Sequence, residues 1–162
     1  EKLTAHVKPK ERGELSLKAI LPEVEGLPTK LVFGHQVFAL TKDRSVVPHG
    51  HDNMATAFLI LKGDFHGRHY DRLADDKEHM IIRPTIDRTF GVGEYSTVSD
   101  LKDNVHWFKA KSDSAFIFNI HVMSVKPGKT GRVYIDPDGE KLSDDRVRCR
   151  KINHQQAETL YG

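Results

Sequence analysis

The amino-acid sequence predicts an all-β fold built as one domain. Short β-rich runs are separated by clusters of Gly, Pro, Asp and Asn at intervals of roughly 8 to 15 residues, a pattern typical of sandwiches and barrels. The chain has 162 residues, of which 38% are hydrophobic, so it is long enough to bury one substantial core. In chain order, the expected strands cover residues 31–33, 36–40, 57–61, 66–70, 80–82, 114–122 and 132–135.

Residues 114–122 carry the clearest strand signal. Apolar side chains occupy every second position from Phe116 to Val122, and the intervening positions include Asn119 and His121. Because alternate side chains of a strand share a face, this pattern predicts one apolar face and one more polar face.

The first residues of the chain differ from the body that follows. They are charged and contain the helix breakers Pro9, Gly13, Pro22 and Gly26. We therefore expect an N-terminal arm over residues 1–28, with a short helix over 14–20.

The main barrel is expected over residues 29–135, followed by a C-terminal extension over 136–162 that packs on it. Asp-Pro-Asp-Gly at 136–139 predicts a strong turn. After it, alternation over 144–150 predicts an edge strand, and residues 153–162 predict either a helical turn or a loose tail.

Composition and charge exclude several classes of protein. The net charge of +2 is too small to indicate nucleic-acid binding, and no apolar stretch approaches the roughly 20 residues that span a membrane. Cys149 is the only cysteine, which excludes an internal disulfide and a cysteine-rich zinc site. We expect a cytoplasmic protein. Because the sequence starts at Glu1 rather than Met, a removed signal peptide and a periplasmic or secreted location stay open.

Three histidines form the main candidate site. His49 and His51 form an H-x-H pair, which places both imidazoles on one face of a strand, and the apolar run 57–61 and Gly63 follow. His106 lies further along, in Asp-Asn-Val-His-Trp-Phe, also before a strand-like run. Imidazole suits Fe, Ni, Cu and Zn, so we predict that these three side chains hold one metal ion.

This arrangement resembles the cupin superfamily. The H-x-H pair and Gly63 match the end of the usual first cupin motif, but the glutamate position of that motif falls on Ala55 or Thr56. The second motif is retained only as His106. The resemblance implies a single-domain jelly-roll β-barrel with short N- and C-terminal accessory segments.

Within that superfamily, three histidines without a glutamate resemble the thiol dioxygenases: cysteine dioxygenase and the cysteamine and plant cysteine oxidases. The resemblance covers roughly residues 46–123, about half of the chain. The matching stretches are His49-x-His51-x-x-Met54, Leu61-x-Gly63, Tyr70-Asp71 and Asn104-Val105-His106-Trp107-Phe108-Lys109-Ala110.

The resemblance implies a non-haem Fe(II) dioxygenase that adds O₂ to a small thiol and forms a sulfinate. Mn, Ni or Zn are alternative metals. Three neutral imidazoles leave a ferrous ion with a net charge of +2, which favours an anionic ligand such as a thiolate or carboxylate. Open coordination positions would let substrate and O₂ bind side by side. The expected partners are therefore a small anionic or thiol substrate and O₂.

Three further residues are candidates for catalysis. His121 falls where cysteine dioxygenase has the histidine of its Ser-His-Tyr relay, while Asn119 and Met123 take the serine and tyrosine positions. We expect Arg68 to bind a substrate carboxylate, because a guanidinium group matches it with two hydrogen bonds, and Tyr70 to donate a hydrogen bond to oxygen.

Two other classes of function stay open. The chain could be another cupin metalloenzyme, such as a lyase, an isomerase or a non-thiol dioxygenase. It could also be a non-catalytic module that binds a small molecule. A homodimer would be compatible with either class.

Overall fold

The computed structural model describes residues 3–11 and 13–162. Strands dominate this part of the chain, and the one helix in it lies at its end. In order, the elements are β1 (Leu15–Lys18), β2 (Gly34–Leu40), β3 (Ser45–Asp52), β4 (Met54–Lys62), β5 (Phe65–Asp75), β6 (His79–Phe90), β7 (Tyr95–Ser99), β8 (Val105–Ala110), β9 (Ala115–Met123), β10 (Gly131–Lys141), β11 (Val147–Ile152) and α1 (His154–Tyr161).

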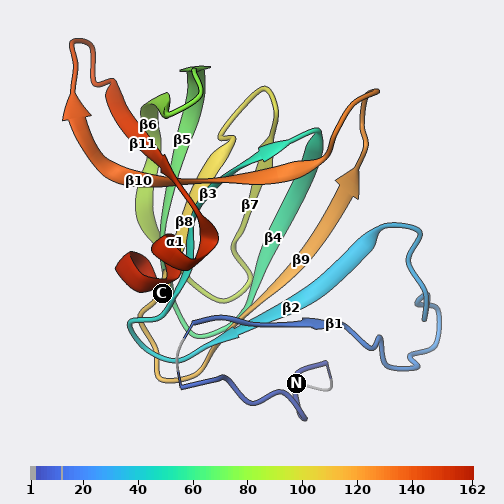
Figure 1. The fold of residues 1–162 in the computed structure, drawn as a ribbon. Coiled ribbons are helices and arrows are strands. Elements are labelled where there is room, and N and C mark those ends of the chain that lie inside the picture. The colour runs from blue at the N-terminus through green and yellow to red at the C-terminus, as the bar shows by residue number, and fades with distance from the viewer. Residues whose placement is uncertain (1–2, 12) are drawn as a thin grey trace.

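The strands form two antiparallel sheets (Figure 1). The five-stranded sheet has the order β1-β2-β9-β4-β7, and the six-stranded sheet has the order β10-β11-β6-β5-β8-β3. The six-stranded sheet is closed, because β10 also pairs with β3. This is the all-β barrel that the sequence predicts.

The main hydrophobic core lies where the two sheets face each other. In β4, buried side chains alternate with more exposed ones, so that Phe58 and Ile60 both enter the core. They meet Phe65, Phe90 and Phe108 from the six-stranded sheet, all nearly inaccessible to solvent. Each such side chain contributes roughly 1.5–3 kcal/mol by leaving water.

A second, smaller core lies on the other face of the six-stranded sheet. It contains Met80, Ile82, Val105, Ile135 and Cys149. Because Val105 and His106 are neighbours on β8, their side chains point to opposite faces, so this core lies behind the histidine face. Burial raises the pKa of the Cys149 thiol to about 12, which makes it a packing residue rather than a nucleophile.

The N-terminal helix expected over 14–20 is wrong. Residues 15–18 form β1, which extends the five-stranded sheet by pairing with β2. So short a helix is marginal on its own, whereas the edge of β2 offers backbone partners. The strand expected over 31–33 is also absent: residues 32 and 33 form a bend, Val32 is 94% exposed, and β2 begins at Gly34.

The turn expected at 136–139 is wrong as well. β10 continues through these residues to Lys141, with an irregularity in its pairing between Asp136 and Glu140. The hairpin turn lies instead between Lys141 and Val147. The expected strand over 144–150 is present as β11, but it pairs on both sides, with β10 and β6, so it is not an edge.

The C-terminal residues therefore belong to the barrel wall. Part of β10 and all of β11 come from the segment 136–162 that was expected to pack on the barrel as an extension. The helical alternative for the last residues is confirmed by α1, whose first turn is capped by reciprocal hydrogen bonds between Asn153 and Gln156. Among the described residues, no helix has the length and apolar character needed to cross a membrane.

Candidate metal centre

Strand pairing brings the three predicted histidines together. His49 and His51 lie on β3 and His106 lies on the neighbouring strand β8, where it stands directly opposite His49 in the antiparallel register. One nitrogen from each ring can be chosen such that all three lie within 4.8 Å of one another. The ring centroids of His49 and His106 are 4.3 Å apart, and those of His51 and His106 are 5.0 Å apart.

The hydrogen bonds of the rings leave nitrogens available for a metal ion. His49 Nδ1 donates to the carbonyl oxygen of Val47 at 2.7 Å, which leaves Nε2 as the free nitrogen. His51 Nδ1 lies 3.3 Å from the sulfur of Met54, and its buried Nε2 has no hydrogen-bond partner among the described residues. The buried Nδ1 of His106 also has none.

These orphaned atoms show that the residues fit a bound cation. The three side chains are only 1–3% exposed, and a buried polar atom without a partner costs about 1–3 kcal/mol. A divalent ion that accepts lone pairs from three imidazoles removes that cost, and the donor set suits Fe, Ni, Cu or Zn.

The backbone between the histidines is held by Asn104. Its amide nitrogen donates to the carbonyl oxygens of His51 at 2.8 Å and Ser99 at 3.0 Å. A Cβ atom at Gly50 would lie 2.7 Å from Asn104 Oδ1, so the middle residue of the H-x-H pair has little room for any side chain. Asn104 and Gly50 thus support the geometry of the pair.

The electrostatic environment keeps all three imidazoles neutral. Burial, followed by the charges of neighbouring histidines, holds the pKa values of His49 and His106 well below the usual range. Burial, followed by the charge of Arg132, lowers the pKa of His51 to about 4. The neutral form, which binds metals, therefore predominates at pH 7.

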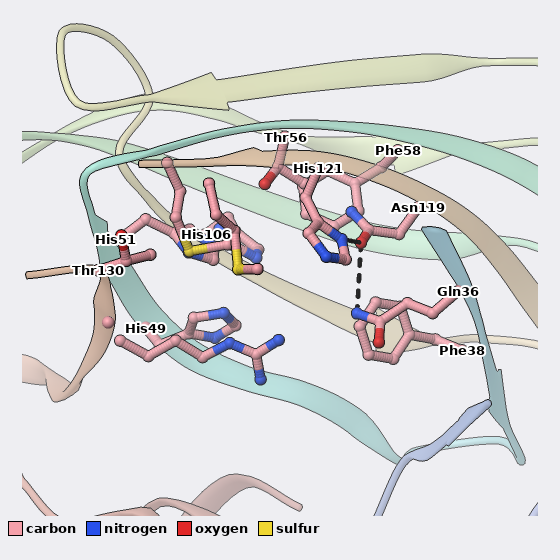
Figure 2. Close-up of a pocket in the computed structure, with 14 residues that line it drawn as sticks. Gln36, Phe38, His49, His51, Thr56, Phe58, His106, Asn119, His121 and Thr130 are labelled. Atoms are coloured by element: carbon pink, nitrogen blue, oxygen red, sulfur yellow. Dashed lines mark hydrogen bonds between the residues drawn. The ribbon is translucent and has the colours of Figure 1, made fainter. Parts of the chain in front are cut away.

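A cavity of about 260 Å³ opens onto the three histidines (Figure 2). Its opposite wall comes from the inner face of the five-stranded sheet, and its rim includes the start of β10. Besides the three histidines, the lining residues are Gln36, Phe38, Met54, Thr56, Phe58, Asn119, His121, Met123, Thr130, Gly131 and Arg132.

His121, the histidine at the relay position, lines this cavity. Its Nδ1 lies 3.1 Å from Asn119 Oδ1. Burial is the main cause of a lowered pKa for His121, and Arg132 and His35 lower it further.

The structure does not bring Arg68 or Tyr70 to the cavity. The Arg68 guanidinium lies over the Trp107 ring, 4.8 Å from its centroid, and Tyr70 packs in the second core. On β5 it is His69 that faces inward, fully buried and opposite His106 in register, so its neighbours at 68 and 70 point to the other face. Neither residue therefore lines the cavity in which a substrate carboxylate or an oxygen atom was expected to meet them.

Arg132 is the cavity residue that sequence reasoning missed. It lies on β10 directly opposite His51, and no ion pair joins it to a carboxylate of the described residues. Thr56 was also unassigned as a binding residue, yet its hydroxyl is buried beside the cavity without a hydrogen-bond partner in the described chain. The only sequence signal for Arg132 was the strand predicted at 132–135. The alternation of its side chains does not reveal which other strand this strand pairs with.

The sequence matches no protein-family model and no curated protein significantly. Solved structures of similar fold are found instead. A cupin superfamily protein from Silicibacter pomeroyi, described as a sugar phosphate isomerase, is 17% identical with a TM-score of 0.51 over 90% of this chain and 83% of that one. A conserved protein with a double-stranded β-helix domain from Klebsiella pneumoniae is 14% identical with a TM-score of 0.50 over 82% of this chain and 87% of that one.

The chain also matches larger proteins in part. It spans only 23% of the length of procruciferin, an 11S globulin from Brassica napus, with 8% identity and a TM-score of 0.47. Identities this low inform on architecture only. With its closed barrel, its two antiparallel sheets and these structural neighbours, the chain has the single-domain, all-β cupin fold.

Proposed function

We propose that this protein is a mononuclear metal-dependent oxygenase of the thiol dioxygenase type, which adds both atoms of O₂ to a small thiol and forms a sulfinate. The observation that supports it most is a buried trio of neutral imidazoles beside a cavity that no carboxylate lines. Of the two positions that could hold the cupin glutamate, Thr56 lines the cavity and supplies only a hydroxyl group.

The metal we favour for His49, His51 and His106 is Fe(II). When bound there, it would supply a redox-active centre of net charge +2 that favours an anionic sulfur ligand and leaves positions open. The chain itself supplies a small, partly apolar space: Phe38 and Phe58 form walls that exclude water from the reacting end of a substrate.

Arg132 supplies the positive charge that Arg68 was expected to supply. Arg132 lines the cavity and is an exposed residue, so its guanidinium group can pair with a carboxylate without a large desolvation cost. The buried hydroxyl of Thr56 offers a second hydrogen bond. A thiol that carries an acidic group fits this distribution of charge better than an aminothiol does.

Arg132 also favours one alternative. A guanidinium group at the cavity rim would suit the phosphate of an anionic sugar, so an isomerase or lyase that uses the same metal site is the second candidate. The structural neighbour described as a sugar phosphate isomerase has a similar fold. Its sequence identity of 17% is too low to transfer its substrate to this chain. Oxygen consumption separates the two candidates, because an isomerase or a lyase consumes none.

The metal site makes a first prediction. Metal-free protein titrated with Fe(II) without oxygen should bind one ion, and His106→Ala should weaken binding on the order of 100-fold or more, because it removes one of three ligands. His66→Ala is the matched control, since His66 lies on β5 and pairs with Asp87 outside the cavity. Equal binding by wild type and His106→Ala, measured by calorimetry, would contradict the site.

The lowered pKa values make a second prediction about pH. Protons compete with a metal only below the pKa of its ligands, and the pKa of His51 is about 4 while those of His49 and His106 are also depressed. The Kd for Zn(II) should therefore stay nearly constant from pH 8 to pH 6. An affinity loss that begins near pH 6.5, the ordinary histidine pKa, would show that the site is more exposed than described.

Oxygen uptake by the iron-loaded protein tests the proposed reaction. An anionic thiol, 3-mercaptopropionate, should stimulate uptake and give a sulfinate by mass spectrometry, and should outperform the cationic thiol cysteamine. Arg132→Gln should lower kcat/KM for the anionic thiol about 10- to 100-fold, as loss of a charged hydrogen bond does. Arg150→Gln on β11, outside the cavity, should change little. If no thiol in a broad panel stimulates uptake, the proposed reaction fails.

A further inference from the structure

The polar wall of the cavity is a directed chain of hydrogen bonds. Asn119 is 2% exposed, and its amide nitrogen donates to the carbonyl oxygen of Ala57 at 3.4 Å. Asn119 Oδ1 accepts from Gln36 Nε2 at 3.3 Å and lies 3.1 Å from His121 Nδ1 (Figure 2). Two groups therefore converge on one carbonyl oxygen, which has no hydrogen to donate.

Gln36 gives the chain its direction. The hydroxyl of Ser16 on β1 donates to Gln36 Oε1 at 2.8 Å, so the Gln36 amide nitrogen is the group that faces Asn119. Each amide in the chain accepts through its oxygen and donates through its nitrogen. Since Asn119 Oδ1 only accepts, the hydrogen of the neutral His121 ring must be on Nδ1.

The other ring nitrogen of this cavity-lining histidine, Nε2, then carries the lone pair. Among the described residues, no hydrogen bond engages Nε2. A Cβ atom at Gly34, which stands opposite His121 on β2, would lie 2.1 Å from Nε2. Only glycine leaves room for the ring there, and Thr56 is the partner of His121 on β4 at its other side.

We propose that Ser16, Gln36 and Asn119 hold His121 in the Nδ1–H tautomer, so that its Nε2 accepts the proton of the substrate thiol. In this step the S–H bond breaks, its electron pair stays on sulfur, and the proton forms an N–H bond at Nε2. The resulting imidazolium keeps its Nδ1–H hydrogen bond to Asn119 Oδ1. Asn119, Gln36 and Ser16 act as positioning residues. The acceptor role rests on the proposed function, whereas the tautomer does not.

The surroundings keep the acceptor in its base form before substrate binds. Burial and the positive charge of Arg132, together with His35, oppose protonation of the empty site. A thiolate formed beside His121 offsets that effect, because opposite charges then lie next to each other. The proton is thus taken up when the anion forms.

Nitrogen NMR of ¹⁵N-histidine-labelled, metal-free protein tests the tautomer at pH 7.5. The His121 signals, assigned by their loss in His121→Gln, should show a protonated Nδ1 and an unprotonated Nε2. Asn119→Leu removes the acceptor and should shift the ring toward the Nε2–H form, while Val92→Ala, in an exposed turn outside the cavity, should leave it unchanged. An Nε2–H tautomer in the wild type would overturn the inference.

Calorimetry in two buffers of different ionisation enthalpy tests the acceptor role on Zn(II)-loaded protein. Binding of 3-mercaptopropionate should release almost no proton to buffer from the wild type, because His121 retains it, and about one proton from His121→Gln. One proton released by both would overturn the acceptor role. Failure of the thiol to bind would overturn that role together with the proposed function, while the NMR result on the tautomer would stand separately.

Discussion

The antiparallel pairing of β3 with β8 is the constraint on which the site depends. It sets His106 opposite His49, and the two-residue period of β3 then adds His51 on the same face. A slip of one residue in this register would turn His106 away and bring Val105 or Trp107 inward. The cores on both faces of the six-stranded sheet hold this register. Phe108 of β8 packs in one core and Val105 packs in the other, and a slip of one residue would move both side chains to the wrong face.

Fold stability and metal binding oppose each other at this site. Burial removes three imidazoles from water and leaves nitrogens of His51 and His106 without partners, which destabilises the metal-free protein. The same burial keeps the rings neutral, and neutral rings bind metals. His69 belongs to this buried group too, since burial lowers its pKa to about 4 and its ring stacks on Phe90.

Strand periodicity made much of this structure predictable. The alternation in residues 114–122 is a local signal from which strand β9 follows. The H-x-H spacing is another, and it places the side chains of His49 and His51 on the same face of β3. The Asp-Pro-Asp-Gly turn was wrong because β10 keeps pairing with β11 on both sides of these residues, with an irregularity between Asp136 and Glu140. Arg132 was missed for a related reason: it reaches the site through pairing with β3, which lies far away in the sequence. Arg68 was misplaced because the buried side chains of Phe65 and His69 determine which face of β5 points inward, and Arg68 lies on the other face.

We propose that His49, His51 and His106 hold one metal ion beside the cavity. Crystals of protein loaded anaerobically with Fe(II), measured on both sides of the iron absorption edge, test it most directly. We expect a single strong anomalous peak at bonding distance from one nitrogen of each of the three rings. A peak at other residues, or an intact trio without a peak in protein that retains iron, would contradict it.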